Sequence, residues 1–203
     1  FIRNLHHVNS KIDFRNKIVI DAGSECGDTP LYFASKGATV YAFEPIKEHF
    51  EAMTKNLSLN EKLAELIIPI NAAVGKDELL TFYRDNSTDI GTSASFVYNK
   101  HGPNARKSQV QGMSLSTILK KYNIEKVDLL KMDCKGCEFF IPNDALKYVD
   151  RIKIEYVARG KYKIENLLKQ LKDSGFNCTM YRDSDSKNSS NIAGYLYGTR
   201  IEE

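Results

Sequence analysis

The sequence predicts one α/β domain built around a doubly wound, mostly parallel β-sheet. Apolar runs typical of buried strands alternate with segments of helical periodicity from residue 17 to residue 175. Such alternation favours parallel strands joined by helices that cover both faces of the sheet. A turn with two glycines follows the first apolar run, as expected where a ligand-binding loop leaves such a sheet.

The length agrees with this prediction, because 203 residues are typical of one domain. We therefore expect a single domain over residues 1–203, with residues 1–16 as an extension before the first strand. The chain begins with Phe1 rather than Met, so we expect this extension to be truncated.

Three strands and two helices are expected in the first half of the chain. Residues 17–20 form a short apolar run, as expected of a strand that is buried on both faces. Thr29 is expected to cap a helix that has Pro30 at its first position and ends at Gly37. The other elements are a strand over residues 38–43, a helix with Ile46, Phe50, Met53 and Leu57 on one face, and a strand over residues 65–71.

Beyond residue 71, a long polar segment separates two groups of elements. A short strand is expected over residues 79–83, and Ser114 is expected to cap a helix. Between them, residues 86–111 are polar and lack any period, which predicts a loop that is functional or mobile. The later elements are strands over residues 127–132 and 152–157, a helix over residues 164–171 that ends at Gly175, and a terminal antiparallel strand pair over residues 176–181 and 192–197.

Charge and hydropathy exclude several classes of protein. Lys and Arg total 29 against 26 Asp and Glu, so the net charge of +3 provides no basic footprint for nucleic acid. No apolar run approaches the ~20 residues of a membrane-spanning helix, and the start does not resemble a leader. We therefore expect a cytoplasmic protein that contacts neither nucleic acid nor a membrane.

The four cysteines predict neither a disulfide framework nor a metal site. Cys134 and Cys137 form a C-x-x-C motif, but Cys26 and Cys178 are single and distant, so the second pair of ligands that zinc would require is missing. We interpret the cysteines as small, buried apolar residues in a reducing compartment, and we expect no metal; a metal or redox role for the C-x-x-C motif is the alternative.

The loop after the first strand is the first candidate for a ligand site. Gly23 and Gly27 permit a tight turn and a close approach of the backbone to a ligand. Glu44 ends the second strand, where a carboxylate can accept both hydroxyls of a ribose. A plain strand-to-helix turn or a solvated strand end would explain either feature alone, but their combination at this spacing favours a nucleoside site.

The charges of this loop favour a ligand without phosphate. The loop lacks the middle glycine of a dinucleotide-binding turn, and it carries Asp21, Glu25 and Asp28, whose charges would repel a pyrophosphate. S-adenosylmethionine carries an ammonium and a sulfonium group and no phosphate, so it suits an acidic loop better. A nicotinamide-dependent dehydrogenase and a nucleoside-binding protein without turnover are the alternatives.

Several motifs in one order resemble the FkbM family of S-adenosylmethionine-dependent methyltransferases. The resemblance covers roughly residues 17–158. It implies a Rossmann-like methyltransferase fold whose last strand is antiparallel, with S-adenosylmethionine as the methyl donor. The segments that carry it are Val19–Gly23 followed by Gly27, Val40–Pro45, Asn71–Gly75, Val127–Glu138 and Lys153–Glu155.

The same resemblance implies roles for individual residues. The loop over residues 21–27 would hold the methionine part of the cofactor, Glu44 the ribose, and residues 71–73 would lie near the adenine. Asp133 would face both the cofactor and the methyl acceptor, and Asp133 and Glu155 are the candidate catalytic residues. The implied cofactor-binding residues are Asp21, Gly23, Ser24, Glu25, Gly27, Glu44, Pro45, Asn71, Ala72, Ala73 and Asp133.

This chain departs from the usual family pattern at several of these positions. Glu25 stands where the family usually has Asn, and Lys135 stands where it usually has an acidic residue. Cys134 and Cys137 replace small apolar residues. Many members also have a His shortly after the glutamate that corresponds to Glu155, whereas this chain continues with Tyr and Val.

The expected methyl acceptor is a hydroxyl of a sugar or another small metabolite. Enzymes that methylate amino groups of nucleic acids carry Asn or Asp followed by Pro-Pro and an aromatic residue, and residues 133–136 do not match. No proline precedes a cysteine, as it would in enzymes that methylate the carbon of cytosine. Asp133, Glu155 and His101 are the candidate general bases.

The polar segment over residues 86–111 is expected to cover the site beside Asp133 and to exclude water from the transfer. Its candidate acceptor contacts are Ser93, Ser95, Tyr98 and His101. A surface loop without a role in catalysis is the alternative.

Overall fold

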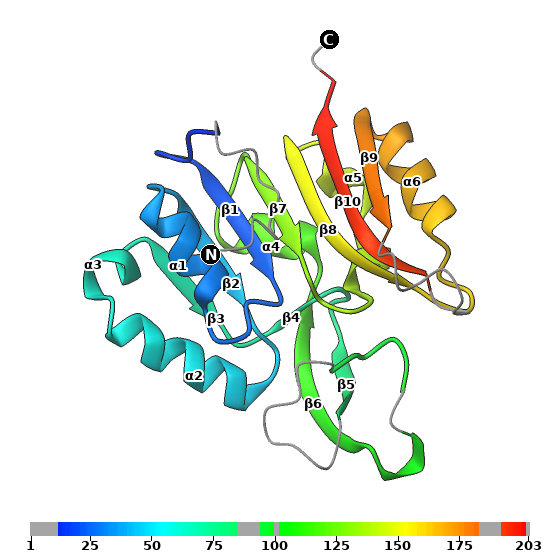
Figure 1. Cartoon of the computed structure of the whole chain (residues 1–203), viewed down its shortest axis with the longest axis horizontal. Coiled ribbons are helices and arrows are strands. Elements are labelled where there is room, and N and C mark those ends of the chain that lie inside the picture. Colours follow the sequence, from blue (N-terminus) through cyan, green and yellow to red (C-terminus); the bar gives the residue numbers. More distant parts are fainter. Residues whose placement is uncertain (1–11, 85–93, 100–101, 183–191, 202–203) are drawn as a thin grey trace.

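The computed structural model describes residues 12–84, 94–99, 102–182 and 192–201, and these residues form a seven-stranded sheet between two layers of helices (Figure 1). Within this seven-stranded sheet, only the strand pairs that involve β10 are antiparallel. The sheet is therefore mostly parallel and ends in an antiparallel pair, which confirms the predicted fold class. In spatial order its strands are β3 (Ile67–Ile70), β2 (Thr39–Phe43), β1 (Ile18–Ala22), β7 (Leu129–Met132), β8 (Arg151–Ala158), β10 (Ile192–Arg200) and β9 (Phe176–Arg182).

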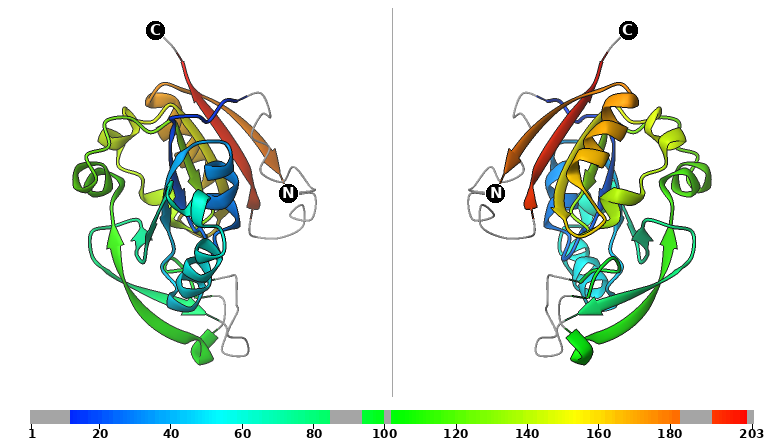
Figure 2. Two further views of the ribbon diagram at one scale, coloured as in Figure 1. Left: turned by 90° about the vertical axis from the view of Figure 1, so that its left-hand side faces the viewer. Right: turned by 90° about the vertical axis from the view of Figure 1, so that its right-hand side faces the viewer.

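The two helix layers cover opposite faces of the sheet, as the edge-on views show (Figure 2). Val19 of β1 packs with the apolar side chains of one layer, and the next residue, Ile20, packs with those of the other. This alternation explains why β1 begins with a run of apolar residues, because both of its faces are buried. One layer contains α1 (Asp28–Ser35), α2 (Lys47–Ser58) and α3 (Glu61–Ala64); the other contains α4 (Leu115–Lys121), α5 (Asn143–Leu146) and α6 (Ile164–Asp173).

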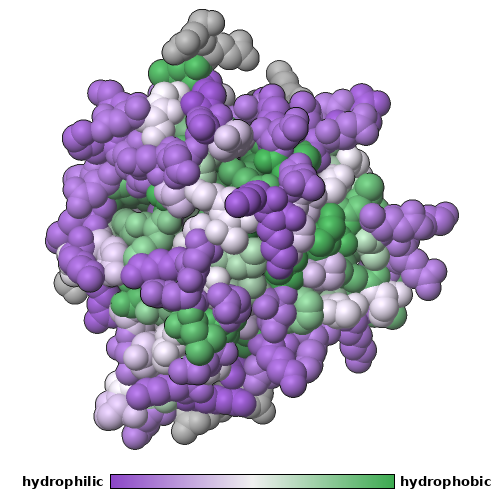
Figure 3. Space-filling model, turned by 180° about the vertical axis from the view of Figure 1, so that it is seen from behind, coloured by the Kyte–Doolittle hydropathy of each residue, from purple (hydrophilic) through white to green (hydrophobic). Residues whose placement is uncertain are grey.

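The outer surface of the helix layer that contains α4, α5 and α6 is mainly polar. Seen from behind, hydrophilic side chains cover most of this face, and apolar groups are visible only in separate areas between them (Figure 3). None of the described helices is long and apolar enough to cross a membrane.

The start of α1 differs from the prediction. The helix begins at Asp28, and its N-cap is Gly27, which has a φ of 91° and no side chain to cap the helix. Thr29 is instead buried at 5% exposure inside the first turn. At α4 the prediction is confirmed, because the Ser114 hydroxyl accepts a hydrogen bond from the backbone N–H of Thr117.

A second, three-stranded sheet lies beside the carboxyl ends of the main strands (Figure 1). It has the order β4-β6-β5, with β4 at Ala73–Val74, β5 at Leu79–Arg84 and β6 at Arg106–Met113. The strand β6 corrects the prediction that all of residues 86–111 form a loop. Four of its eight residues are exposed, and its first four residues are all polar, so this part of the chain lacks the apolar alternation that marks a half-buried strand.

The second sheet is attached to α2 by ion pairs. Both terminal nitrogens of Arg84, at the end of β5, donate to the carboxylate of Glu48 on α2, at 3.0 and 3.1 Å. Arg106 of β6 reaches the same carboxylate at 3.2 Å. The small sheet is therefore held over the edge of the main sheet where the strands β1, β2 and β7 end.

Short elements complete the described chain. Two 3-10 helices span Gly102–Asn104 and Cys137–Phe140. These helices, together with α3 and α5, were not predicted, since an element of three or four residues is too short to display a period.

Candidate functional site

A cleft lies at the point where the strand order reverses between β1 and β7, beneath the small sheet. Strands of a doubly wound sheet diverge at such a point, and ligands bind outside their carboxyl ends. Its walls come from the turns after β1, β2 and β7, from the start of α2 and from the small sheet. The lining residues are Gly23, Glu25, Glu44, Pro45, Ile46, His49, Ala73, Val74, Phe82, Ala94, Phe96, Asp133, Cys134, Lys135 and Cys137.

Gly23 allows the turns after β1 and β7 to meet. Its φ of +84° is left-handed, and a Cβ placed on it would lie 2.1 Å from the carbonyl oxygen of Asp133. The backbone N–H of Asp133 also donates to the carbonyl of Ala22 at 2.8 Å. The floor of the cleft is therefore two backbone segments in direct contact, which only glycine permits.

Glu44 organises the opposite end of the cleft. It is 3% exposed, and its two carboxylate oxygens accept the backbone N–H groups of Glu25, at 2.9 Å, and of Ile46, at 2.8 Å. Each oxygen keeps a second lone pair, so the carboxylate can still accept a hydroxyl of a ligand. His49 Nδ1 lies 3.7 Å from Glu44 Oε1, and the interaction with this carboxylate raises the pKa of His49.

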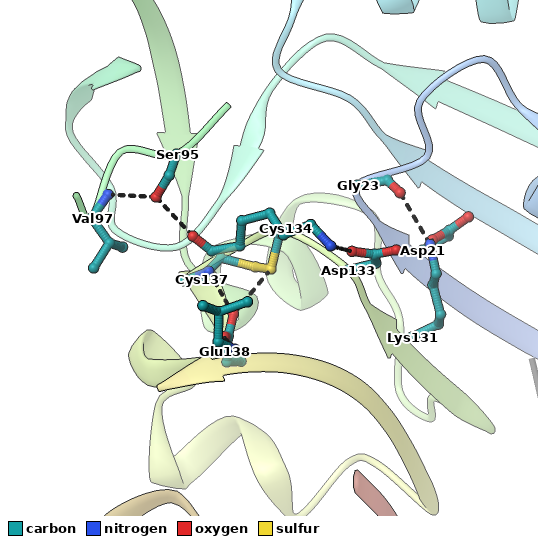
Figure 4. The surroundings of a disulfide bond; sticks show 12 residues. Asp21, Gly23, Ser95, Val97, Lys131, Asp133, Cys134, Cys137 and Glu138 are labelled. Atoms are coloured by element: carbon teal, nitrogen blue, oxygen red, sulfur yellow. Dashed lines mark hydrogen bonds and ion pairs between the residues drawn. A yellow bond between two sulfur atoms is a disulfide. The ribbon is translucent and has the colours of Figure 1, made fainter. Parts of the chain in front are cut away.

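The acidity of the loop after β1 is smaller than its composition suggests. Asp21 is fully buried, and one of its oxygens lies 2.8 Å from Nζ of Lys131 on β7, which also donates to the Gly23 carbonyl at 3.0 Å (Figure 4). Burial raises the pKa of Asp21, although Lys131 opposes this effect. Asp28 is exposed at the start of α1, outside the cleft lining.

Of the three carboxylates expected to repel a pyrophosphate, only Glu25 lines the cleft. The predicted preference for a cationic ligand therefore depends on Glu25 and on Asp133. The pKa of Glu25 is raised, first by burial and second by the negative charge of Asp133.

Asp133 and Glu155 lie on either side of one lysine. Nζ of Lys135 donates to Asp133 Oδ1 at 2.7 Å and to Glu155 Oε1 at 2.6 Å. Burial works against the charge of Asp133, but the two cations Lys135 and Lys131 outweigh it and lower the pKa of Asp133. Burial and then the charge of Asp133 raise the pKa of Glu155. Asp133 lines the cleft, whereas Glu155 lies behind Lys135 and does not.

The C-x-x-C motif forms a disulfide in this wall of the cleft (Figure 4). Cys137 is 1% exposed and belongs to the apolar core, as predicted, but its sulfur is bonded to that of Cys134. The interpretation of both as plain apolar residues is therefore wrong. Their Cα atoms are 5.5 Å apart, within the usual range for a disulfide, because Lys135 and Gly136 turn back with positive φ values.

Part of the segment over residues 86–111 reaches this wall. The Ser95 hydroxyl donates to the carbonyl of Lys135 at 2.7 Å, and a Cβ placed on Gly136 would meet the side chain of Val97 at 2.4 Å. Tyr98 lies over the guanidinium of Arg159, outside the cleft lining. Ser93 and His101 lie outside the described residues.

The predicted cofactor residues divide into two groups. Gly23, Glu25, Glu44, Pro45, Ala73 and Asp133 line the cleft. The others lie outside the lining: the buried Ser24 donates from its hydroxyl to the carbonyl of Asp21, and the amide of the exposed Asn71 donates to the carbonyl of Glu44 at 2.8 Å. Asp21, Gly27 and Ala72 are buried and lie outside the lining.

Sequence reasoning missed the apolar wall of the cleft. The rings of Phe82 on β5 and of Phe96 pack against each other at a tilt of 52°, with centroids 5.4 Å apart, and Ile46 and Val74 complete this wall. The alternation of buried residues along β5 is the signal that could have indicated Phe82. Phe96 lies in a polar segment without period, so no local pattern marks it.

Comparison with known proteins identifies the family. The curated Methyltransferase sdnD of Sordaria araneosa is 29% identical over 169 residues, which are 70% of this chain and 64% of that protein, so the chain spans about two thirds of that relative. A solved structure of a putative rRNA methylase from Clostridium thermocellum has a TM-score of 0.55 at 13% identity, covering 93% of this chain and 91% of that one.

An rRNA methylase from Streptococcus thermophilus also has a TM-score of 0.55, at 12% identity, covering 92% of this chain and 88% of that one. Both likenesses confirm the fold. The family described as the methyltransferase FkbM domain matches residues 21–178, which include the whole of the cleft lining. The chain belongs to the FkbM family of methyltransferases.

Proposed function

We propose that this chain transfers the methyl group of S-adenosylmethionine to a hydroxyl of a sugar or another small metabolite. The observation that carries the proposal is the cleft at the switch point, which has the carboxylate of Glu44 at one end and the carboxylate of Asp133 at the other. Both ends face one space between the turns after β1, β2 and β7.

The donor set of the cleft fits S-adenosylmethionine. The Glu44 carboxylate retains lone pairs for the ribose hydroxyls, and the apolar wall that includes Ile46 and Phe96 suits an adenine ring. Glu25 and Asp133 supply negative charge for the ammonium and sulfonium groups. The bound cofactor supplies an electrophilic methyl group, and this chain supplies position and charge.

The methyl acceptor would lie beside Asp133. Because its pKa is lowered, Asp133 is ionised at neutral pH, so it can orient a hydroxyl and take its proton as the oxygen–carbon bond forms. Lys135 holds that carboxylate in place and links it to Glu155, which we assign a positioning role. Alignment of the hydroxyl supplies much of the rate in such a reaction.

Replacing Asp133 tests this assignment. With S-adenosylmethionine and a panel of sugars and polyols, we expect release of S-adenosylhomocysteine, and Asp133→Asn should lower kcat by about 100-fold or more. The matched control is Asp128→Asn, because Asp128 lies at the opposite ends of β1 and β7 and pairs with Lys17. The control should keep the kcat of the parent.

Two outcomes would contradict the proposal. Tight binding of the cofactor without product from any acceptor would favour a nucleoside-binding protein without turnover. An unchanged kcat in Asp133→Asn would remove the proposed base. Membership of a methyltransferase family argues against the dehydrogenase alternative.

We also propose that the segment around Ser95 covers the acceptor end of the cleft. Removing its buried hydroxyl in Ser95→Ala leaves the Lys135 carbonyl and the N–H of Val97 without their partner. We expect the KM for the acceptor to rise about 5- to 30-fold, corresponding to about 1–2 kcal/mol, while cofactor affinity stays within about twofold. Steady-state kinetics and calorimetry measure the two effects.

Ser108→Ala is the matched control for this prediction. Ser108 lies on β6 of the same small sheet, and its buried hydroxyl has no hydrogen-bond partner among the described residues. The control should keep the parental KM. If Ser95→Ala kept it as well, the segment would be a surface excursion without a role in acceptor binding.

A further inference from the structure

The Cys134–Cys137 disulfide is part of the wall of the cleft, and its Cys134 end is partly exposed. Both residues line the cleft, and they stand between Asp133 and the buried Glu138 (Figure 4). No role in methyl transfer accounts for a sulfur–sulfur bond at this place.

The two sulfurs have unequal access to solvent. Cys134 is half-buried at the cleft, whereas Cys137 is 1% exposed and packs in the main core cluster. Thiol–disulfide exchange requires a collinear approach to one sulfur, so the exposed member of such a pair reacts first and the buried member resolves the intermediate.

A buried carboxylate stands beside the pair. Glu138 is fully buried, and its Oε2 lies 3.7 Å from Sγ of Cys134. Its oxygens accept the N–H groups of Gly136 and Val157, at 2.8 and 3.1 Å, which fix the carboxylate in this position. Burial raises the pKa of Glu138 to about 7.

In the described part of the chain, the titratable side chains that interact with Glu138 include Lys135 and Tyr98. Lys135, from the same turn, lowers the pKa of Glu138, and Tyr98, from the covering segment, carries no charge at neutral pH. A carboxyl group that changes its protonation near pH 7 can exchange a proton with a neighbouring thiol under ordinary conditions.

We propose that Cys134 and Cys137 form a reversible dithiol–disulfide site that exchanges with small disulfides such as oxidised glutathione, with Cys134 as the attacking sulfur and Glu138 as its proton acceptor. Glu138 takes the proton of the Cys134 thiol, and the thiolate attacks one sulfur of glutathione disulfide. This step forms a mixed disulfide and releases one glutathione.

The Cys137 thiol then completes the exchange. As it loses its proton, its sulfur attacks Cys134, forms the Cys134–Cys137 bond and releases the second glutathione. Two cysteine thiols are oxidised by two electrons in total, and one glutathione disulfide is reduced to two glutathione thiols, which receive the two protons. The exchange needs no methyl donor, so its failure and the failure of the proposed methyl transfer are distinguishable.

The experiment uses a chain in which the two free cysteines, Cys26 and Cys178, are replaced by serine. The reduced protein is incubated with excess glutathione disulfide, quenched in acid, alkylated in denaturant and weighed by mass spectrometry. We expect two alkyl groups before the exchange and none after it, with two glutathione thiols released for each chain.

Two single replacements in this background test the direction of attack. Cys137→Ser should accumulate one stable glutathione adduct on Cys134. Cys134→Ser should react at least about tenfold more slowly, because its remaining thiol is buried. Equal rates in the two variants, or a parent that keeps two alkylatable thiols, would overturn the proposal.

The role of Glu138 is tested by the pH dependence of the exchange rate. In the parent, the rate should rise through pH 7 as Glu138 loses its proton, and Glu138→Gln should lower the rate at pH 7 about tenfold and remove this rise. The parental pH profile provides the same test if the variant does not fold. A profile that follows only an ordinary thiol, with its rise near pH 8.5, would exclude Glu138.

Discussion

Gly23→Ala is expected to abolish cofactor binding and to destabilise the fold by about 3–5 kcal/mol. The new Cβ would lie 2.1 Å from the Asp133 carbonyl oxygen, which belongs to the backbone and cannot rotate away. The φ of +84° adds strain to the clash. The turns after β1 and β7 must therefore separate, which breaks the floor of the cleft. Urea unfolding measures the loss of stability, and calorimetry measures the affinity for S-adenosylmethionine.

Gly160→Ala is the matched control, because Gly160 has a φ of +59° and a Cβ placed on it would meet no atom within 4 Å. It should cost about 1 kcal/mol from backbone strain alone and leave cofactor affinity unchanged. A Gly23→Ala protein that binds the cofactor like the parent would show that the two turns do not form the ligand site.

Glu44→Ala is expected to weaken the binding of S-adenosylmethionine by about 2–4 kcal/mol, or about 30- to 1000-fold. The variant loses the carboxylate that would accept the two ribose hydroxyls. It also leaves the N–H groups of Glu25 and Ile46 unpaired, so the free energy of unfolding should fall by about 1–3 kcal/mol. The sequence alone predicts little effect on folding, because it does not reveal these two backbone partners.

Glu51→Ala on the exposed face of α2 controls for the loss of a negative charge. Its ion pair with Lys47 spans 3.7 Å, and its side chain is 62% exposed, so both affinity and stability should stay close to those of the parent. Affinity measured by calorimetry and unfolding measured by urea separate the two effects of Glu44→Ala. If the affinity were unchanged, the ribose would have to bind elsewhere.

The strands that build the cleft were predictable because their signals are local. A strand buried on both faces needs a run of apolar residues, and the runs that became β1, β2 and β7 contain them. The turn after β1 and the carboxylate after β2 are marked by residue type at a fixed spacing. The strand β6 was missed because half of its residues are exposed and its first four residues are polar, so no apolar pattern indicated its pairing with β5.

Interactions between distant residues could not be predicted from the sequence. From the composition of the loop after β1 alone, Asp21 is expected to carry an unpaired negative charge. In the structure, β7 brings Nζ of Lys131 to within 2.8 Å of Asp21 Oδ1. A C-x-x-C spacing is equally compatible with free thiols, a metal site and a disulfide, and only the positive φ values of Lys135 and Gly136 bring the two sulfurs together. In both cases the chemistry depends on neighbours that local patterns do not specify.

The contact between β1 and β7 has a consequence for the order in which the chain folds. The hydrogen bond from Ile18 to Asp128 closes a loop of 110 residues, whose chain entropy costs on the order of 4 kcal/mol. A growing chain that ends before Leu129 contains the turn with Gly23 but not the wall that Asp133 provides. The cleft therefore forms late, after long-range pairing that is slow by nature. Because both halves of the chain contribute to it, a bound cofactor stabilises the entire domain against unfolding rather than one local unit.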